Sequence, residues 1–153
     1  MLDPADFDLP TLAALAGEAA NRHLLTRLHD AGYTGIRISH GYVIQRLVDD
    51  EPTVGELAEQ LGITQQAVSK TVVELESLGY VQRRVDAADS RARRVALSER
   101  GRAALAQARA DRQDLERQIS GDLRPAKQAL VQLLDISGEL PAVTERRARP
   151  AGD

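Results

Sequence analysis

The chain has 153 residues, the length of one domain with a substantial core, and its formal net charge is −3. It contains no cysteine, which excludes disulfides, thiol chemistry and cysteine–zinc sites from this sequence. No apolar run is long enough to cross a membrane, and the acidic start from Met1 to Asp8 is unlike a signal peptide. We therefore expect a cytoplasmic protein.

The charge is unevenly distributed along the chain. Residues 1–63 carry 4 basic and 10 acidic side chains, whereas residues 64–112 carry 10 basic and 6 acidic ones. Residues 113–153 are nearly balanced, with 6 basic and 7 acidic side chains. Positive charge is thus concentrated in the middle of the chain, a pattern typical of a segment that contacts an anionic partner.

The composition, rich in alanine, leucine and charged residues, favours a mainly helical protein. Segments 1–9 and 137–153 are predicted to be disordered. Apolar residues at three- and four-residue steps predict helices over residues 10–30 and about 38–48. Thr53 is the predicted N-cap of a helix that ends at Gly62, and Thr64 that of a helix over 65–78 that ends at Gly79.

The second half of the chain begins with two short strands. Weak alternation predicts them over 81–85 and 94–97, joined by a turn at 86–91. Ser98 is the predicted cap of a long helix to about residue 120, and Pro125 opens a last helix over 126–136. A helix–turn–helix followed by a hairpin is a winged helix. The expected fold is therefore mainly α with a small β-wing.

The helix over 65–78 has two unlike sides. At 100° per residue, Val68, Val72 and Leu75 share one side. The opposite side carries polar or small residues, namely Gln66, Ser69, Lys70, Val73 and Ser77, and Gln65 lies in the first turn. The DNA major groove admits one helix, and its edges offer partners for amide, hydroxyl, ammonium and methyl groups. We therefore predict that Gln65, Gln66, Ser69, Lys70 and Val73 contact the major groove; the alternative is a solvated face that happens to be uncharged.

The predicted hairpin is the most basic part of the chain. The stretch RRVDAADSRARRV, residues 83–95, holds five arginines against two aspartates. Arginine enters minor grooves and grips phosphates with a fork of donors. We predict that Arg84, Asp89, Arg91, Arg93 and Arg94 serve the minor groove and the phosphates, with Asp89 holding the Arg91 guanidinium in one rotamer. The alternative is a solvated, arginine-rich loop.

These motifs together resemble the MarR family of bacterial transcription regulators. The resemblance covers about residues 53–105. It includes Glu56-Leu57-Ala58, Leu61-Gly62-Ile63, Val68-Ser69, Leu75-Glu76, Leu78-Gly79-Tyr80-Val81 and, in the wing, Asp86, Asp89, Arg91, Val95, Leu97 and Gly101. The spacing of Asp89 and Arg91 is its most family-specific element.

The resemblance implies one domain over 10–136 in a homodimer. Helices in 10–35 and 98–136 would form the dimerisation region, and 36–97 the DNA-binding lobe. It further implies a repressor of a pseudo-palindromic double-stranded operator, with recognition helices in successive major grooves about 34–36 Å apart. Release by a small aromatic or phenolic acid is also expected, from a cleft between the dimerisation region and the lobe.

The remaining polar residues suggest at most a ligand site. Tyr33, Arg37, His40 and Arg46 form the candidate effector pocket, because an arginine pairs with a carboxylate; a structural or solvent-facing role for the histidine is the alternative. His23 is expected between the dimerisation helices. No spacing suggests a metal site, a cofactor or an activated nucleophile, so we expect no metal, no cofactor and no enzyme.

A second reading of the winged helix is a protein–protein adaptor without specific DNA binding. Such a module would lack a basic wing and carry apolar residues on the exposed side of its second helix. The arginines of residues 83–95 argue against it.

Overall fold

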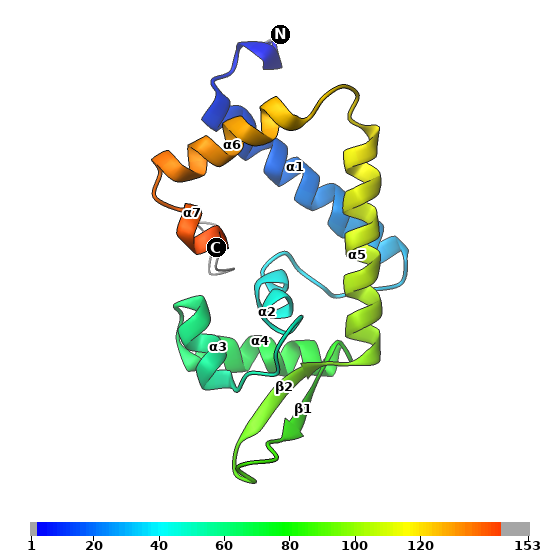
Figure 1. The fold of residues 1–153 in the computed structure, drawn as a ribbon. Coiled ribbons are helices and arrows are strands. Elements are labelled where there is room, and N and C mark those ends of the chain that lie inside the picture. The colour runs from blue at the N-terminus through cyan, green and yellow to red at the C-terminus, as the bar shows by residue number, and fades with distance from the viewer. Residues whose placement is uncertain (1–2, 145–153) are drawn as a thin grey trace.

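The structure is a computed structural model that describes residues 3–144. Its elements follow in the order η1 (Pro4–Asp6), α1 (Leu9–Asp30), α2 (His40–Arg46), α3 (Val54–Leu61), α4 (Gln65–Ser77), β1 (Val81–Val85), β2 (Arg93–Leu97), α5 (Glu99–Gln118), α6 (Arg124–Ile136) and α7 (Leu140–Thr144). Figure 1 shows the hairpin projecting below a lobe made of α2, α3 and α4. The predicted fold, mainly α with a small β-wing, is confirmed.

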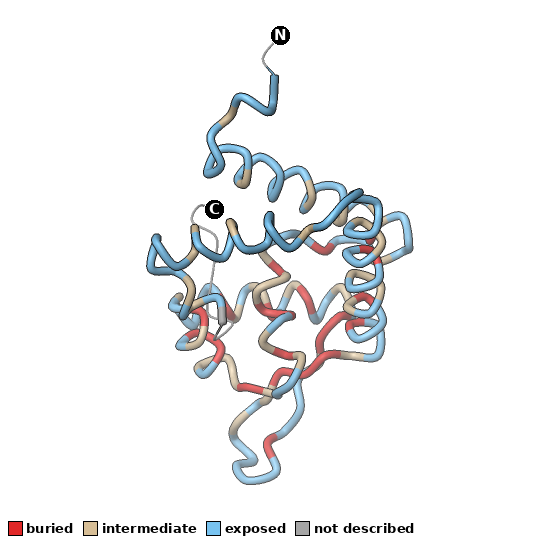
Figure 2. Tube along the Cα trace, turned by 45° about the horizontal axis from the view of Figure 1, so that its top comes forward, coloured by how far each residue is buried: buried red, intermediate tan, exposed pale blue. Residues whose placement is uncertain are grey.

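The hydrophobic core lies in this lobe. Leu57 of α3 packs with Val68, Val72 and Leu75 of α4, and all four side chains are fully buried. Figure 2 shows the buried positions gathered around α2, α3, α4 and the junction of β2 with α5, whereas most of α1 and α6 is exposed. The core therefore fixes α4 within the lobe. It also includes Val81, Val95 and Leu97 of the hairpin strands, whereas the tip of the hairpin lies outside it.

Local capping sets the ends of α3 and α4. The Thr53 hydroxyl accepts from the Glu56 N–H at 3.2 Å, and the Glu56 carboxylate accepts from the Thr53 N–H at 2.7 Å. Such a reciprocal capping box satisfies two backbone donors that the helix leaves unpaired. Thr64 accepts from the Ala67 N–H at 3.2 Å, and Gly62 between the helices has a φ of +64°. The predicted N-caps and the glycine between them are confirmed.

The hairpin is antiparallel and fastened to the start of α3. Its register pairs Val81 with Leu97 and Val85 with Arg93. Beyond the two strands, the Val95 N–H donates to the Pro52 carbonyl at 2.9 Å, and Thr53 forms an isolated bridge with Arg94. The base of the hairpin is thus bonded to the segment that caps the helix–turn–helix.

The other helices form a second, less buried region. α1 packs along α5, and Arg27 of α1 lies 2.9 Å from the buried carboxylate of Asp111 of α5. α6 makes its main contacts with α7. Large apolar side chains are exposed along these helices, namely Leu9, Leu12, Leu15, Ile119, Leu130, Val131, Ile136 and Val143. Of the described helices, none combines the length and the apolar character needed to cross a membrane.

The structure differs from the expected boundaries in several places. α2 begins at His40, two residues later than predicted, and its N-cap Ser39 makes no side-chain capping bond. Part of the N-terminal segment that we expected to be disordered is ordered, because the Asp8 side chain caps α1 and the Asp3 side chain caps η1. The short helix α7 lies within the predicted disordered tail, where Leu140 and Pro141 open it. Residues 145–153 lie outside the described residues.

Candidate nucleic-acid interface

The recognition helix α4 presents to solvent the side that its sequence pattern predicts. Val68 and Val72 are fully buried, while Gln66 and Lys70 on the opposite side are exposed. Val73 is 52% exposed, although an apolar side chain of this size is usually covered. α4 therefore offers one free side about two turns long, with an amide, an ammonium and an apolar group on it.

The first and last turns of α4 are more constrained than its middle. Gln65 is exposed, yet a Cβ built on Gly55 would lie 3.3 Å from its amide nitrogen, so this side chain lies over the start of α3. Ser69 is half-buried. Ser77 donates its hydroxyl to the Glu74 carbonyl at 2.7 Å. Gln66, Lys70 and Val73 are thus the members of the predicted set that project most freely.

Two of the predicted wing arginines are held at the base of the hairpin. Arg94 pairs with the Asp86 carboxylate through Nε, and its Nη1 donates to the Glu51 carbonyl at 3.0 Å. Arg84 lies 2.9 Å from the Glu51 carboxylate. These carboxylates already balance the two guanidinium charges, so the side chains brace the wing against the segment before α3.

Asp89 acts on the backbone of the wing tip rather than on an arginine side chain. Its Oδ1 accepts from the Arg91 N–H at 2.9 Å, and its carbonyl accepts from the Ala92 N–H at 3.0 Å. The expectation that Asp89 holds the Arg91 guanidinium is therefore wrong, because two residues of chain bring its carboxylate to the amide and not to the side chain. The bond shapes the turn that carries Arg91.

Asp86 is a residue whose role sequence reasoning missed. Its Oδ1 accepts from the Ala88 N–H at 2.7 Å, and its other oxygen pairs with Arg94. These bonds hold the pKa of the Asp86 carboxyl below its usual range, the Ala88 N–H contributing most. The available signal was its position directly after β1, where antiparallel pairing brings it close to the start of β2.

The tip of the wing carries arginines whose guanidinium groups have no carboxylate partner among the described residues. Arg91 is exposed, and its guanidinium makes no hydrogen bond or ion pair to any described residue. Arg93 donates only to carbonyls, those of Ser90 at 2.9 Å and Ala92 at 3.2 Å. Lys70 on α4 is likewise without an ion pair within residues 3–144. Uncompensated positive charge therefore lies on α4 and at the wing tip.

The cleft between the lobe and the long helices contains one of the four predicted effector residues. It has a volume of about 250 Å³ and is lined by side chains of α1, α2 and α5 and of the loop before α2. Its lining is mainly apolar and includes Arg37 and Arg112. Tyr33, His40 and Arg46 are not among the lining residues. Tyr33 instead packs on Arg100, with 5.6 Å from the guanidinium carbon to the ring centre, His40 is fully buried, and Arg46 is half-buried.

Comparison with known proteins finds a match for the lobe that contains α4 and the wing. Residues 34–92 match the sequence model of the MarR family. Over these residues the winged helix is similar to that of MarR-family proteins.

Solved structures of similar fold extend over most of the chain. A transcriptional regulator from Thermotoga maritima is 26% identical, with 91% of this chain and 96% of that chain aligned and a TM-score of 0.58. A MepR variant from S. aureus bound to an oligodeoxyribonucleotide is 19% identical, with 88% and 99% aligned and a TM-score of 0.61. Apo MarR from E. coli is 20% identical, with 84% and 96% aligned and a TM-score of 0.58. No curated protein matches the sequence.

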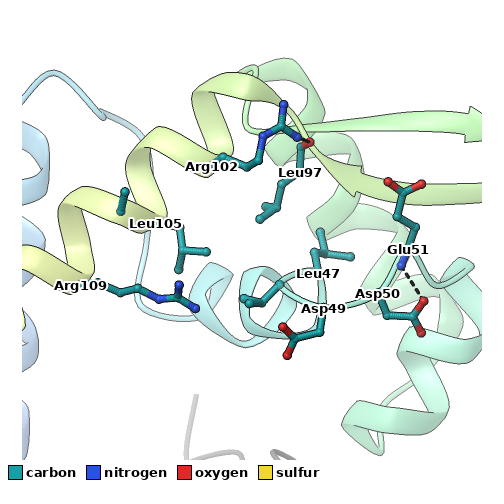
Figure 3. Close-up of a pocket in the computed structure, with 10 residues that line it drawn as sticks. Leu47, Asp49, Asp50, Glu51, Leu97, Arg102, Leu105 and Arg109 are labelled. Atoms are coloured by element: carbon teal, nitrogen blue, oxygen red, sulfur yellow. Dashed lines mark hydrogen bonds between the residues drawn. The ribbon is translucent and has the colours of Figure 1, made fainter.

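The chain also has a second pocket, which the sequence did not indicate. It has a volume of about 490 Å³ and lies between α5 and the segment that follows α2 (Figure 3). Leu47, Leu97 and Leu105 line it, with carboxylates of residues 49–51 on one side and Arg102 and Arg109 on the other. The Asp50 carboxylate accepts from the Glu51 N–H at 2.8 Å. Over residues 3–144, no three histidine or acidic side chains lie close enough together to hold a metal ion.

Proposed function

We propose that this chain is a transcriptional regulator that binds double-stranded DNA in a sequence-specific manner. One observation carries the proposal: the free side of α4 lies next to a hairpin whose tip cations have no carboxylate partner. A helix fits the major groove, while an arginine on a neighbouring hairpin reaches the minor groove or the phosphates. The DNA-bound structure of similar fold supports the same partner.

The positions of the side chains support different roles in DNA binding. Gln66 is suited to adenine, Lys70 to guanine or a phosphate, and Val73 to a thymine methyl group. Ser69 and Gln65 add polar contacts from the first two turns. Arg91 and Arg93 enter the minor groove or contact phosphates. The wing is held in shape by Arg84, Arg94 and Asp89. In this proposal these three residues support the wing and do not contact the DNA directly.

The exposed apolar surface of the long helices supports a homodimer. Leu15 of α1 is 48% exposed, and Val131 and Ile136 of α6 are 49% and 85% exposed. Large apolar side chains exposed on the surface in this number mark a protein–protein interface. A second copy of the chain covers this surface in the proposed dimer, and its two α4 helices then bind a pseudo-palindromic operator, one half-site each.

The cleft that contains Arg37 supports an effector. A small aromatic or phenolic acid would place its ring among the apolar side chains and its carboxylate on Arg37, with Arg112 as a second cation. We propose that binding there releases the operator and that the operator-bound protein represses transcription.

The test is a fluorescence anisotropy titration with labelled genomic duplexes that include the promoter of its own gene. We expect one fragment to bind far more tightly than random duplex, and binding to weaken steeply with salt as counterions are released. An aromatic acid should release that fragment. Failure to bind any duplex at low salt, together with a stable partner protein in a pull-down, would instead establish the adaptor function.

A further inference from the structure

One fully buried polar side chain joins the recognition helix to α2. His40 begins α2, and its side chain is 1% exposed. Its Nδ1 accepts from the Arg37 backbone N–H at 3.3 Å, and its Nε2 lies 3.4 Å from Oε2 of Glu74. Glu74 belongs to α4 and lies one helical turn after Lys70. The histidine therefore contacts the same helix whose other side is exposed for DNA.

The fixed backbone N–H of Arg37 indicates which ring nitrogen of His40 carries the proton. Because Nδ1 accepts from a backbone N–H, it carries no proton, and the neutral ring holds its proton on Nε2. Nη2 of Arg37 lies 3.1 Å from that Nε2 and pairs with the same Glu74 oxygen. Two donors from the α2 side thus converge on one carboxylate oxygen of α4.

We propose that Arg37, His40 and Glu74 form a pH-sensitive latch that positions α4 for DNA only while His40 is neutral. The inference rests on the proposed DNA binding. A second proton on His40 would sit on Nδ1, facing the Arg37 N–H, so that hydrogen bond would break. It would also place a buried cation beside the Arg37 guanidinium. Protonation therefore opens the latch and frees α4 from α2.

The electrostatics of the site agree with this direction. Burial lowers the pKa of the His40 imidazole from its ordinary value of 6.5, the Arg37 charge lowers it further, and Glu74 acts in the opposite direction. Arg37 and Glu74 are the charged groups that act on this ring among the described residues. Between the lowered pKa and 6.5 the open state binds more protons than the closed one. The latch is thus fully stabilised above pH 6.5 and is lost as the pH falls through the lowered pKa.

The first test measures the affinity of the whole protein for a fixed duplex from pH 8 to pH 5.5 at constant salt. We expect wild-type affinity to fall below about pH 6.5, by up to about tenfold per pH unit for each protomer. His40→Gln, which keeps a donor for Glu74 but does not titrate, should bind at high pH with a flat profile. His29→Gln is the matched control, because His29 contacts the Ile36 carbonyl at 2.8 Å and can donate there in either charge state. It should retain the wild-type profile.

A second variant and a spectroscopic measurement test the latch even if the His40 variant fails to fold. Glu74→Gln keeps a side-chain oxygen that can accept from His40 and Arg37 but removes the charge that raises the pKa of His40, so the midpoint of the decline should move to lower pH. In histidine-labelled wild-type protein, NMR should show the Nε2–H tautomer at pH 8 and a titration that coincides with shifts of the α4 amides. An unchanged midpoint in Glu74→Gln, a flat wild-type profile or the other tautomer would overturn the latch. Absence of duplex binding at every pH would refute the proposed function, and the NMR titration would still decide the latch.

Discussion

At the residue scale, arginines of the wing have the same side chain and different surroundings. Arg94 is half-buried and paired with Asp86, whereas Arg91 is exposed with no ion pair to the described residues. A paired guanidinium has already lost much of its water and gains little from a phosphate, while a free one can neutralise a phosphate and release a counterion. Arg91 is therefore the wing residue expected to dominate the salt dependence of DNA binding.

Replacing Arg91 with alanine should weaken binding to all duplexes by a similar factor. The slope of log affinity against log salt should fall by about one for each phosphate that the variant no longer neutralises. Anisotropy titrations at four salt concentrations, on the preferred duplex and on random duplex, measure both quantities. An effect confined to the preferred duplex would mean that Arg91 reads bases instead.

Replacing Gln66 with alanine should change which sequence is preferred. An amide that bonds an adenine edge discriminates by about 1–3 kcal/mol against the wrong base pair. Selection from a randomised duplex pool should therefore show relaxed preference at one position of each half-site. Gln65→Ala is the comparison, since Gln65 lies over the start of α3, and its preference should change less.

At the element scale, the junction between the lobe and α5 depends on one close approach. A Cβ on Gly101 would lie 2.0 Å from the carbonyl oxygen of Tyr80, a backbone atom that accepts the Ser98 N–H. Neither group can move without loosening the start of α5. The glycine is needed here for space, and the same junction connects the lobe to the helices of the proposed dimer.

Gly101→Ala should therefore destabilise the fold by about 1–3 kcal/mol or more, the range for overpacking a tight site. Gly41→Ala in α2 is the matched control, because nothing lies within 4 Å of its added methyl group. It should be neutral or stabilising by up to about 1 kcal/mol, since alanine favours a helix over glycine. Urea unfolding of both variants beside the wild type measures the difference.

At the scale of the whole molecule, one lobe contains most of the buried residues, whereas the long helices outside it are largely exposed (Figure 2). α6 is amphipathic, and its apolar side meets little of its own chain. This surface is the one we expect a second copy to cover.

Val131→Glu should convert the proposed dimer to monomers at micromolar concentration, because it would bury an unpaired carboxylate in the interface. Gln132→Glu adds the same charge one residue further along α6, away from its apolar side, and should leave the dimer intact. Light scattering after size-exclusion chromatography distinguishes the two masses. A Val131→Glu variant that stays dimeric would place the interface elsewhere.

The sequence predicted the features that depend on neighbouring residues. The caps at Thr53 and Thr64 and the free side of α4 follow from local geometry and helical period. Contacts between distant segments were not predictable, because periodicity says which side is buried and not what it meets. The pairing of Arg37 with Glu74 joins residues 37 positions apart, and that of Arg27 with Asp111 spans 84. Asp89 was misassigned because its backbone bond depends on the turn conformation.

The bonds of Arg94 have a consequence for the DNA as well as for the protein. This side chain ties the hairpin to the Glu51 carbonyl and lies 3.5 Å from the Glu56 carboxylate of the α3 capping box. The hairpin is therefore held at a fixed distance and angle from the helix–turn–helix, and the two elements do not move independently. Inserting a single base pair, about 3.4 Å along a strand, between the stretch read in the major groove and the stretch gripped in the minor groove should put the two out of step.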